Sequence, residues 1–330
     1  MSSRFRPVFG FAFLLGSALA LTQCGGGSSP TSPAPVVENP IPVTTTPPIT
    51  SPDPAVETPT GPPVIPAPGN ASTTVSVMGD TGWCGSPALA PIATLFGRLD
   101  GDILLAGDLA YPGGTAAEFR DCFDPSFGKF KSRIRATPGN HEYVASVSAD
   151  SYFTYFGDRS GPNRLGYYAF REAEWTVLML NSNVPISKTS AQYAFVRTTM
   201  QQAPTRCTLA VMHHPFDSSS LNGPTPSLRD IWELMYNLGA DLVIAGHDHV
   251  YERHSPVSTD QRRDDVKGIR QMTVGTGGAP LYGRVRNAAN SELLISTYGI
   301  LRLKLDPALY EWQFLDTTGN VLDRGVTVCH

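Results

Sequence analysis

Residues 241–249 read Asp-Leu-Val-Ile-Ala-Gly-His-Asp-His, a short apolar run followed by a glycine and two histidines. The apolar run predicts a buried β-strand that ends at the glycine. Residues two apart in an extended chain point to the same side, so we expect His247 and His249 to leave the strand on one side. Imidazole is a common metal ligand, and the pair indicates a site for one or two metal ions. Taken alone, these residues also fit a polar turn after a strand.

The composition is that of a large folded protein. The chain has 330 residues, of which 41% are hydrophobic and 16% are charged, and its formal net charge is −4. This length is sufficient for one large domain. The net negative charge argues against a general affinity for nucleic acid. The sequence does not indicate an oligomeric state.

Residues 1–24 have the pattern of a signal peptide. Two arginines precede an apolar run over residues 8–21, which is short for a membrane span and typical of an export leader. Residues 18–20, Ala-Leu-Ala, offer a cleavage site for ordinary secretion. Residues 21–24 instead resemble a bacterial lipobox in which Cys24 is lipidated, although a glutamine replaces the small residue usual before that cysteine. We therefore expect an exported protein, either a cell-envelope lipoprotein that touches the membrane through this lipid alone or a secreted protein.

Residues 25–72 and residues 73–330 differ in composition. The first segment is rich in proline, serine and threonine, and such a segment cannot bury enough apolar surface to offset the entropy lost on ordering. We therefore expect a disordered linker with extended polyproline conformations, which tethers the rest of the chain. The second segment is expected to form the folded domain.

The folded part alternates strand-like and helix-like segments. Apolar and β-branched runs predict strands, and the longer segments between them predict helices. This alternation indicates an α/β layered domain. The expected strands cover residues 74–78, 103–106, 133–136, 175–180, 208–212 and 241–245; the expected helices cover residues 88–99, 116–123, 190–202 and 227–238; and the tail from about residue 271 is expected to be mostly β.

Polar residues follow five of these strands at the point where each strand ends. In open α/β sheets, ligands bind beyond the carboxyl ends of the strands. Each motif alone also fits an ordinary turn or a hydrogen-bonded core histidine, but chance placement of all five in this order is improbable. The five motifs are Gly79-Asp80-Thr81-Gly82, Gly107-Asp108-Leu109-Ala110-Tyr111, Gly139-Asn140-His141-Glu142, His213-His214-Pro215 and Gly246-His247-Asp248-His249.

As a set, these motifs resemble those of the calcineurin-like metallophosphoesterases, and specifically those of the purple acid phosphatase branch. The resemblance spans almost all of residues 73–330, and residues 274–279, Val-Gly-Thr-Gly-Gly-Ala, also look like the family. It implies two packed mixed β-sheets flanked by helices, a four-layer sandwich, in a single catalytic domain.

The resemblance implies a centre for two metal ions. Transferred residue by residue, the ligands of one ion are Asp80, Asp108, Tyr111 and His249, and those of the other are Asp108, Asn140, His213 and His247. Asp108 would bridge the two ions, as a carboxylate can, and the oxygen and nitrogen donors suit Fe, Zn or Mn.

Tyr111 indicates which metals the centre would hold. Many two-metal phosphoesterases have a histidine two positions after the first aspartate, where this chain has Gly82. A phenolate in place of a neutral imidazole favours a trivalent ion. The resemblance therefore implies Fe(III) with a divalent partner, which is Zn, Fe or Mn. The alternative for Tyr111 is a packed aromatic side chain without a metal.

The resemblance also implies a mechanism. Two close cations neutralise the phosphate oxygens and lower the pKa of a bound water, so that metal-bound hydroxide attacks phosphorus. His141 is expected to contact the phosphate or to protonate the leaving oxygen. His214 either shares this task or is a structural histidine. Tyr251 and Arg253 are placed to support the ligands, although Arg253 also fits a simple ion pair with a carboxylate.

The function expected from this set is hydrolysis of phosphate esters, with phosphomonoesters first, as in an acid phosphatase. The same metal pair can serve phosphodiester hydrolysis, and a surface module that binds phosphate without catalysis is a third interpretation. Residues 216–220, Phe-Asp-Ser-Ser-Ser, lack the histidines that the plant enzymes have after the His-x-Pro motif. The substrate preference of those enzymes therefore does not transfer to this chain.

Four cysteines follow the leader: Cys84, Cys122, Cys207 and Cys329. An even number in an exported domain suggests disulfides, and four cysteines allow three connectivities. We favour Cys84–Cys122, because both follow early strands, and Cys207–Cys329, which would attach the C-terminus to a core strand. A ligand role for Cys84 is the alternative, since it lies near the first aspartate motif.

Overall fold

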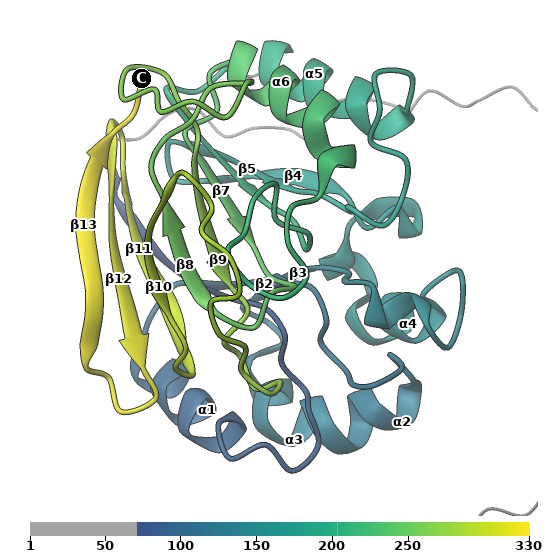
Figure 1. The fold of residues 1–330 in the computed structure, drawn as a ribbon. Coiled ribbons are helices and arrows are strands. Elements are labelled where there is room, and N and C mark those ends of the chain that lie inside the picture. Colours follow the sequence, from purple (N-terminus) through teal and green to yellow (C-terminus); the bar gives the residue numbers. More distant parts are fainter. Residues whose placement is uncertain (1–70, 203) are drawn as a thin grey trace, which may run out of the picture. The chain divides into compact units, whose positions relative to one another are not determined.

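The fold is shown in Figure 1 as a computed structural model, which describes residues 71–330 except residue 203. The expected signal peptide, residues 1–24, lies outside the described residues, as does almost all of the expected linker, residues 25–72. Within the described part of the chain, none of the helices is both long enough and apolar enough to cross a membrane.

Six strands form the first sheet, in the order β13-β12-β11-β1-β2-β3. The strands β1, β2 and β3 are parallel, whereas β11, β12 and β13 form an antiparallel meander that joins β1. The parallel strands are largely apolar and buried, as expected for strands that are covered on both faces. The bounds are Thr73–Met78 (β1), Asp102–Ala106 (β2), Ile134–Thr137 (β3), Gly299–Asp306 (β11), Leu309–Asp316 (β12) and Val321–Val328 (β13).

Seven strands form the second sheet, in the order β10-β8-β9-β7-β6-β5-β4. Its centre, formed by β5, β6, β7 and β9, is parallel, and β4, β8 and β10 pair antiparallel with their neighbours. Both sheets are therefore mixed. The bounds are Tyr168–Glu172 (β4), Trp175–Met179 (β5), Cys207–Val211 (β6), Leu242–Ala245 (β7), Tyr251–His254 (β8), Arg270–Val274 (β9) and Ser291–Ile295 (β10).

Helices cover the outer face of each sheet. In Figure 1, α1, α2 and α3 lie along one side of the sheets, and α5 and α6 lie along the opposite side. The helix α1 buries Leu89, Ile92 and Phe96, whose spacing places them on one face that packs on the sheet. The α-helices are Leu89–Arg98 (α1), Ala116–Glu118 (α2), Asp124–Phe127 (α3), Asp150–Phe156 (α4), Ala191–Gln202 (α5) and Arg229–Asn237 (α6), with a π-helical turn at Phe119–Phe123 and 3-10 turns at Gly128–Phe130, His141–Tyr143, Gly157–Ser160, Pro162–Arg164 and Pro226–Leu228.

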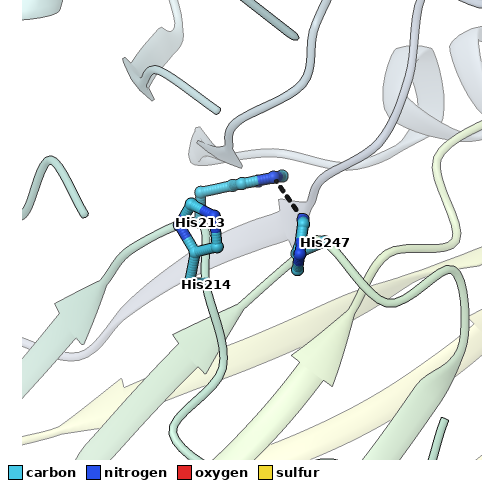
Figure 2. A group of neighbouring side chains, drawn as sticks. All are labelled: His213, His214 and His247. Atoms are coloured by element: carbon cyan, nitrogen blue, oxygen red, sulfur yellow. Dashed lines mark hydrogen bonds between the residues drawn. The ribbon is translucent and has the colours of Figure 1, made fainter. Parts of the chain in front are cut away.

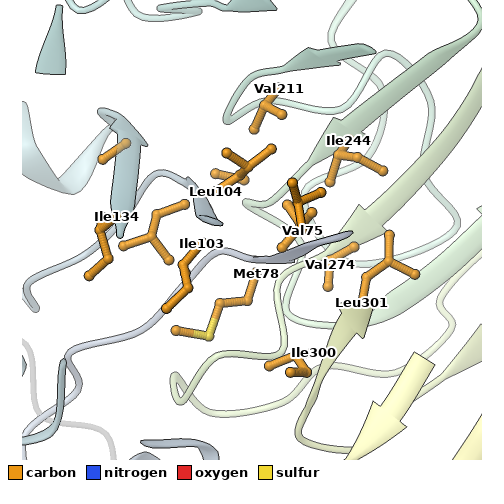
Figure 3. Close-up of a cluster of buried hydrophobic side chains, with 14 of the residues drawn as sticks. Val75, Met78, Ile103, Leu104, Ile134, Val211, Ile244, Val274, Ile300 and Leu301 are labelled. Atoms are coloured by element: carbon orange, nitrogen blue, oxygen red, sulfur yellow. The ribbon is translucent and has the colours of Figure 1, made fainter. Parts of the chain in front are cut away.

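The main core lies between the two sheets. Successive residues of a strand point to opposite faces, and β5 follows this rule: Val177 and Met179 pack in the core between the sheets, whereas Leu178 packs against α5 and α6. Figure 3 shows apolar side chains of both sheets in this core, among them Leu104 of β2 and Val211 of β6. A second cluster under α5 and α6 completes the packing of the second sheet.

The expected architecture of two mixed sheets flanked by helices is confirmed. The strands β4 and β8 were not expected from the sequence, whereas β10 falls in the tail that was expected to be mostly β. The strand β4 is an edge of the second sheet, where no continuous apolar run is needed, and three of the four residues of β8 are polar. Polar residues therefore weaken their patterns. The expected helix at 116–123 is broken into α2, the π-helical turn and α3, and the short helix α4 was also not expected.

Two disulfides join distant parts of the chain. The structure contains Cys84–Cys122 and Cys207–Cys329, which are the pairings favoured from the sequence. The second disulfide connects β6 to the residue after β13. It therefore fastens the last strand of one sheet to the centre of the other.

We expect removal of the Cys207–Cys329 disulfide to lower the stability of the domain. The double substitution Cys207→Ala/Cys329→Ala opens a loop closed across 122 residues, and the chain-entropy model assigns such a closure about 4–5 kcal/mol. Thermal unfolding of the oxidised proteins measures the loss. The matched control, Cys84→Ala/Cys122→Ala, opens a loop of 38 residues and is expected to lose about 1 kcal/mol less. A Cys207→Ala/Cys329→Ala protein as stable as the native chain would contradict this prediction.

Candidate metal centre

The seven predicted ligands come together where the strands of both sheets end. Each lies in the loop that follows a strand: Asp80 after β1, Asp108 and Tyr111 after β2, Asn140 after β3, His213 after β6, and His247 and His249 after β7. The resemblance assigns them to two groups that share Asp108, and the structure also places ligand atoms of Asp80, Asp108 and His213 within 4.8 Å of one another. We name the groups after Tyr111 and His213.

The Tyr111 group consists of Asp80, Asp108, Tyr111 and His249. The Tyr111 hydroxyl oxygen lies 3.0 Å from Asp80 Oδ1, 3.0 Å from Asp108 Oδ2 and 3.3 Å from His249 Nε2. Asp80 Oδ1 and His249 Nε2 are 3.4 Å apart. All four residues are buried. The Tyr111 hydroxyl oxygen is therefore in contact with the other three donor atoms of its group.

The His213 group consists of Asp108, Asn140, His213 and His247. His213 Nε2 lies 2.9 Å from Asn140 Oδ1, 3.3 Å from Asp108 Oδ2 and 3.1 Å from His247 Nδ1. The dashed line in Figure 2 marks the contact between the two imidazoles. Asp108 Oδ2 is thus close to donors of both groups, which is the position that a bridging ligand needs.

Backbone carbonyls orient two of the imidazoles. His213 Nδ1 lies 2.8 Å from the Ala106 carbonyl oxygen, and His249 Nδ1 lies 2.8 Å from the Pro280 carbonyl oxygen. Because a carbonyl only accepts hydrogen bonds, each Nδ1 carries a proton. In a neutral ring the lone pair is then on Nε2, the atom that faces the other donors. This arrangement is typical of metal-binding histidines.

Left-handed backbone brings the side chains inward. Asp80, Asp108 and His247 have φ values of 57°, 55° and 71°, which few non-glycine residues adopt. The expectation that His247 and His249 continue an extended strand is wrong. The strand β7 ends at Ala245, and the chain turns, with Asp248 N donating to the Gly246 carbonyl oxygen at 2.8 Å. The two histidines consequently enter different groups.

Burial and charge shift the pKa values in the centre. Burial, together with Asp80 and Asp108, raises the pKa of Tyr111 well above its usual value. Burial alone would raise the pKa of Asp108, but the positive charge of His213 holds it well below its usual range. Burial would lower the pKa of His213, but Asp108 and Asp80 raise it to about 9. A protonated His213 therefore supplies positive charge beside the carboxylates, and the neutral phenol of Tyr111 supplies a hydrogen-bond donor.

The residues present fit two metal ions. Two carboxylates, a phenol, an amide oxygen and three imidazoles form the oxygen and nitrogen donor set that Fe, Zn and Mn accept. Two glycines leave room for the carboxylates: a Cβ on Gly139 would lie 2.0 Å from Asp108 Oδ1, and a Cβ on Gly246 would lie 2.6 Å from Asp80 Oδ2. A larger residue at Gly139 or Gly246 would therefore displace a carboxylate ligand of the centre.

His141 lies beside the Tyr111 group. Its ring centroid is 4.4 Å from that of Tyr111, and its Nε2 is 3.7 Å from Asp108 Oδ2. Its Nδ1 lies 2.6 Å from the Pro112 carbonyl oxygen, so Nδ1 carries a proton and Nε2 faces the centre. The side chain is 30% exposed, which makes it accessible to a molecule that enters from solvent.

His214 lies beside the His213 group, as Figure 2 shows, with its ring centroid 4.4 Å from that of His247. Its backbone N donates to Ser182 Oγ at 3.1 Å, and Ser182 Oγ is 2.8 Å from His214 Nδ1. Burial and the charges of His213 and His247 lower the pKa of His214 to about 3. The ring is therefore neutral, and with the Ser182 hydroxyl donating to Nδ1 its proton is on Nε2.

Three other residues singled out from the sequence lie outside the two groups. The Tyr251 hydroxyl and Arg253 Nε both donate to Asp323 Oδ2 of β13, at 2.7 and 2.8 Å. The ion-pair alternative therefore describes Arg253. Cys84 is joined to Cys122, so it has no free thiolate to offer a metal.

Glu142 supports the centre, although no role was expected for it from the sequence. It is fully buried, and its two carboxylate oxygens accept four backbone N–H groups: those of Asp108 (3.0 Å), Leu109 (2.8 Å), Ala110 (3.3 Å) and Gly139 (2.7 Å). Burial and the charge of Asp108 raise its pKa to about 8. Glu142 thus holds the loop after β2 against the loop after β3. Its place at the end of the Gly-Asn-His-Glu motif was the available signal.

Asp248, between the two histidines, fastens a neighbouring loop to the centre. Asn222 N donates to Asp248 Oδ1 at 2.8 Å, and Asn222 Nδ2 donates to the His247 carbonyl oxygen at 2.9 Å. Residues 218–220 of the same loop are buried. The segment after the His-x-Pro motif is therefore packed next to the His213 group even though it lacks histidines.

Comparison with known proteins gives one family and several relatives. Residues 73–251, more than half of the chain, match the calcineurin-like phosphoesterase family. Purple acid phosphatase 21 of Arabidopsis thaliana is 28% identical over 226 residues, which cover 61% of this chain and 50% of that protein. Phosphoenolpyruvate phosphatase of Allium cepa is 24% identical over 252 residues, which cover 69% of this chain and 51% of that protein. The chain spans about half the length of these curated relatives.

Two solved structures share the fold. Purple acid phosphatase PPD1 from yellow lupin (Lupinus luteus) seeds has a TM-score of 0.67 at 19% identity, over 80% of this chain and 55% of that chain. GAP50, the anchor in the inner membrane complex of Plasmodium, has a TM-score of 0.62 at 14% identity, over 78% of this chain and 89% of that chain. At these identities the likeness shows the fold alone.

We expect Glu142→Gln to destabilise the protein and to disturb both groups. A glutamine amide would turn an NH₂ group towards two backbone N–H groups in either orientation, and each buried donor left unpaired costs about 1–3 kcal/mol. Thermal unfolding and metal content measure the effect. The matched control is Glu118→Gln: the partly exposed Glu118 also accepts backbone N–H groups, from Gly113 and Thr115, but it ends a capping box in which glutamine serves equally well. Equal stability of the two variants would contradict the role assigned to Glu142.

Proposed function

The chain belongs to the calcineurin-like phosphoesterase family, in its purple acid phosphatase-like branch, and from this premise we propose that it is an exported phosphohydrolase that uses two metal ions to hydrolyse phosphomonoesters. The observation that carries the proposal is the position of Asp108 Oδ2, 3.0 Å from the Tyr111 hydroxyl oxygen and 3.3 Å from His213 Nε2. A carboxylate oxygen between two sets of donors is suited to hold two cations close together.

The seven ligands would hold the two ions. Asp80, Asp108, Tyr111 and His249 would bind one, and Asp108, Asn140, His213 and His247 would bind the other. When bound, the ions would neutralise phosphate oxygens and lower the pKa of a water, which supplies a nucleophile near neutral pH. The phenol of Tyr111 supports Fe(III) in the Tyr111 group, because a hard anionic donor stabilises a trivalent ion. The divalent partner would be Zn, Fe or Mn.

His214 would orient the phosphate. Its Nε2–H is a neutral hydrogen-bond donor, because Ser182 occupies Nδ1 and the pKa of His214 is lowered to about 3. A donor of this kind binds a phosphate oxygen without exchanging protons with it. The ring contacts the ring of His247, so the donor lies next to the His213 group. This interpretation favours the phosphate-binding role for His214 over the purely structural one.

His141 would protonate the leaving oxygen. The hydrogen bond from Nδ1 to the Pro112 carbonyl oxygen fixes the ring and leaves Nε2 to exchange a proton with the substrate. In the doubly protonated form of the ring, the proton of Nε2 would pass to the leaving oxygen as its bond to phosphorus breaks, and His141 would be left neutral with its proton on Nδ1. The partial exposure of the ring supports this role, since an alcohol must leave towards solvent.

The names of the relatives favour monoesters over diesters. Purple acid phosphatase 21 and phosphoenolpyruvate phosphatase are both named as phosphatases. Hydrolysis of diesters on the same metal pair, and binding of phosphate without catalysis, remain the alternatives. Turnover of a monoester and of a diester, together with binding of phosphate, distinguishes these three functions.

Export is part of the proposal. Residues 1–24 have a signal-peptide pattern and lie outside the described residues. The two disulfides support export, because such bonds persist in oxidising compartments. We propose a cell-envelope lipoprotein anchored through Cys24, with residues 25–72 as the spacer and ordinary secretion as the alternative.

We expect the metal-loaded protein to hydrolyse p-nitrophenyl phosphate faster than bis-p-nitrophenyl phosphate. Asp108→Ala and His247→Ala should each lower kcat/KM for the monoester by at least about 100-fold, because each removes a donor that would hold a cation. Circular dichroism checks that the variants fold. The matched control, Asp260→Ala, removes an exposed carboxylate paired with Arg262 and should keep full activity. A preferred diester, or binding of phosphate with turnover of neither ester, would favour the corresponding alternative.

We expect elemental analysis to find iron, and we expect a visible absorption band from charge transfer between Tyr111 and Fe(III). Tyr111→Phe removes the phenol oxygen, so the band should vanish, while the fold is retained because Phe keeps the ring. Absorption spectra of the two proteins at equal concentration make the comparison. A colourless native protein with two zinc or two manganese ions would exclude Fe(III) and leave Tyr111 as a packed aromatic residue.

A further inference from the structure

The arrangement of rings beside the centre points to the kind of alcohol that the substrate carries. We propose that Trp83 stacks on an aromatic ring in the alcohol part of the phosphomonoester, and that the enzyme therefore prefers aryl and benzyl-type esters. The proposal rests on the proposed function and names the substrate class of that same centre.

Trp83 lies next to a predicted ligand and faces solvent. Its ring centroid is 5.2 Å from that of Tyr111, with the planes tilted by 48°. It is 37% exposed, whereas the other three tryptophans of the chain, Trp175, Trp232 and Trp312, are at most 5% exposed. Trp83 is thus the one tryptophan that can present a free aromatic surface to an entering molecule.

The loop that carries Trp83 is held on both sides. Gly82 has a φ of 61° and packs so closely that a Cβ there would lie 1.9 Å from the Leu109 carbonyl oxygen. Tyr111 N donates to the Gly82 carbonyl oxygen at 3.4 Å. On the other side, Cys84 is joined to Cys122. Because the backbone on both sides of Trp83 is fixed, stacking a substrate ring on the indole requires little further ordering of this loop.

The position of His141 defines where the alcohol part must lie. The ring of His141 contacts the same Tyr111 ring as Trp83 does, with centroids 4.4 Å apart. A leaving oxygen that receives its proton from His141 lies beside this ring. An aromatic group attached to that oxygen, directly or through one carbon, would extend along the Tyr111 ring towards Trp83, and aromatic rings attract each other at centroid distances of about 4.5–7 Å. Trp83 is placed to receive it.

Benzyl phosphate and ethyl phosphate test the proposal. Both are esters of primary alcohols of similar acidity, but benzyl phosphate alone carries an aromatic ring. We expect Trp83→Ala to lower kcat/KM for benzyl phosphate about fivefold to tenfold and to change that for ethyl phosphate by less than about twofold. Trp83→Phe keeps a ring and should retain most of the preference. Equal losses on the two esters would overturn the proposal, since Trp83 would then act only through the packing of Tyr111.

A binding measurement separates this proposal from the proposed function. Benzylphosphonate has a carbon–phosphorus bond and resists hydrolysis. Its binding to the metal-loaded protein should change the emission of the exposed Trp83, ethylphosphonate should leave the emission unchanged, and Trp83→Phe should abolish the effect. A benzyl-specific change without turnover of any ester would support ring recognition and reject the hydrolase. Turnover of esters with no benzyl preference and no emission change would reject ring recognition and keep the hydrolase.

Discussion

The close approach of two backbones, where the two sheets meet, is the constraint on which the centre depends. Gly79 N donates to the Val274 carbonyl oxygen at 2.8 Å, and Gly277 N donates to the Gly79 carbonyl oxygen at 3.0 Å. These bonds join the end of β1 in one sheet to the end of β9 in the other. A Cβ on Gly79 would lie 3.3 Å from the Cα of Gly246, so the contact leaves almost no room for a side chain. Ligands from both sheets can share Asp108 because the sheets touch here.

The charges of the centre link folding to metal binding. Asp80 and Asp108 are buried side by side, and buried carboxylates are costly unless positive charge or hydrogen bonds balance them. In the metal-free protein the protons of Tyr111 and His213 provide this balance. Cations that displace those protons would stabilise the folded chain over the unfolded one, because the unfolded chain does not hold the seven donors together. Glu142 acts differently, because it ties down the loop that carries Asp108 through hydrogen bonds to backbone N–H groups.

The sequence predicts those parts of the structure that depend on local pattern. The apolar runs of β1, β2, β3, β6 and β7 identify buried strands, and the motifs after them, together with the family resemblance, identify the seven ligands, because strand ends in such sheets share one edge. The strands β4 and β8 escape this logic, because polar residues interrupt their apolar patterns. Glu142 escapes it for another reason: its partners are backbone N–H groups, which no sequence displays. The turn at His247 contradicts the expectation of an extended chain through His247 and His249, but the His247 side chain still lies in the centre.

The pairing of β1 has a consequence for how the protein is made. Thr73, in the first strand, pairs with Leu305 of β11, so the sheet that carries Asp80 and Asp108 gains one of its central partners only after residue 305 has been made. Pairings between such distant residues form slowly. A nascent chain that has emerged as far as residue 290 still lacks this partner, and the bond between Cys207 and Cys329 has no second cysteine. A chain made only as far as residue 290 can therefore complete neither the first sheet nor the bond that joins β6 to the residue after β13.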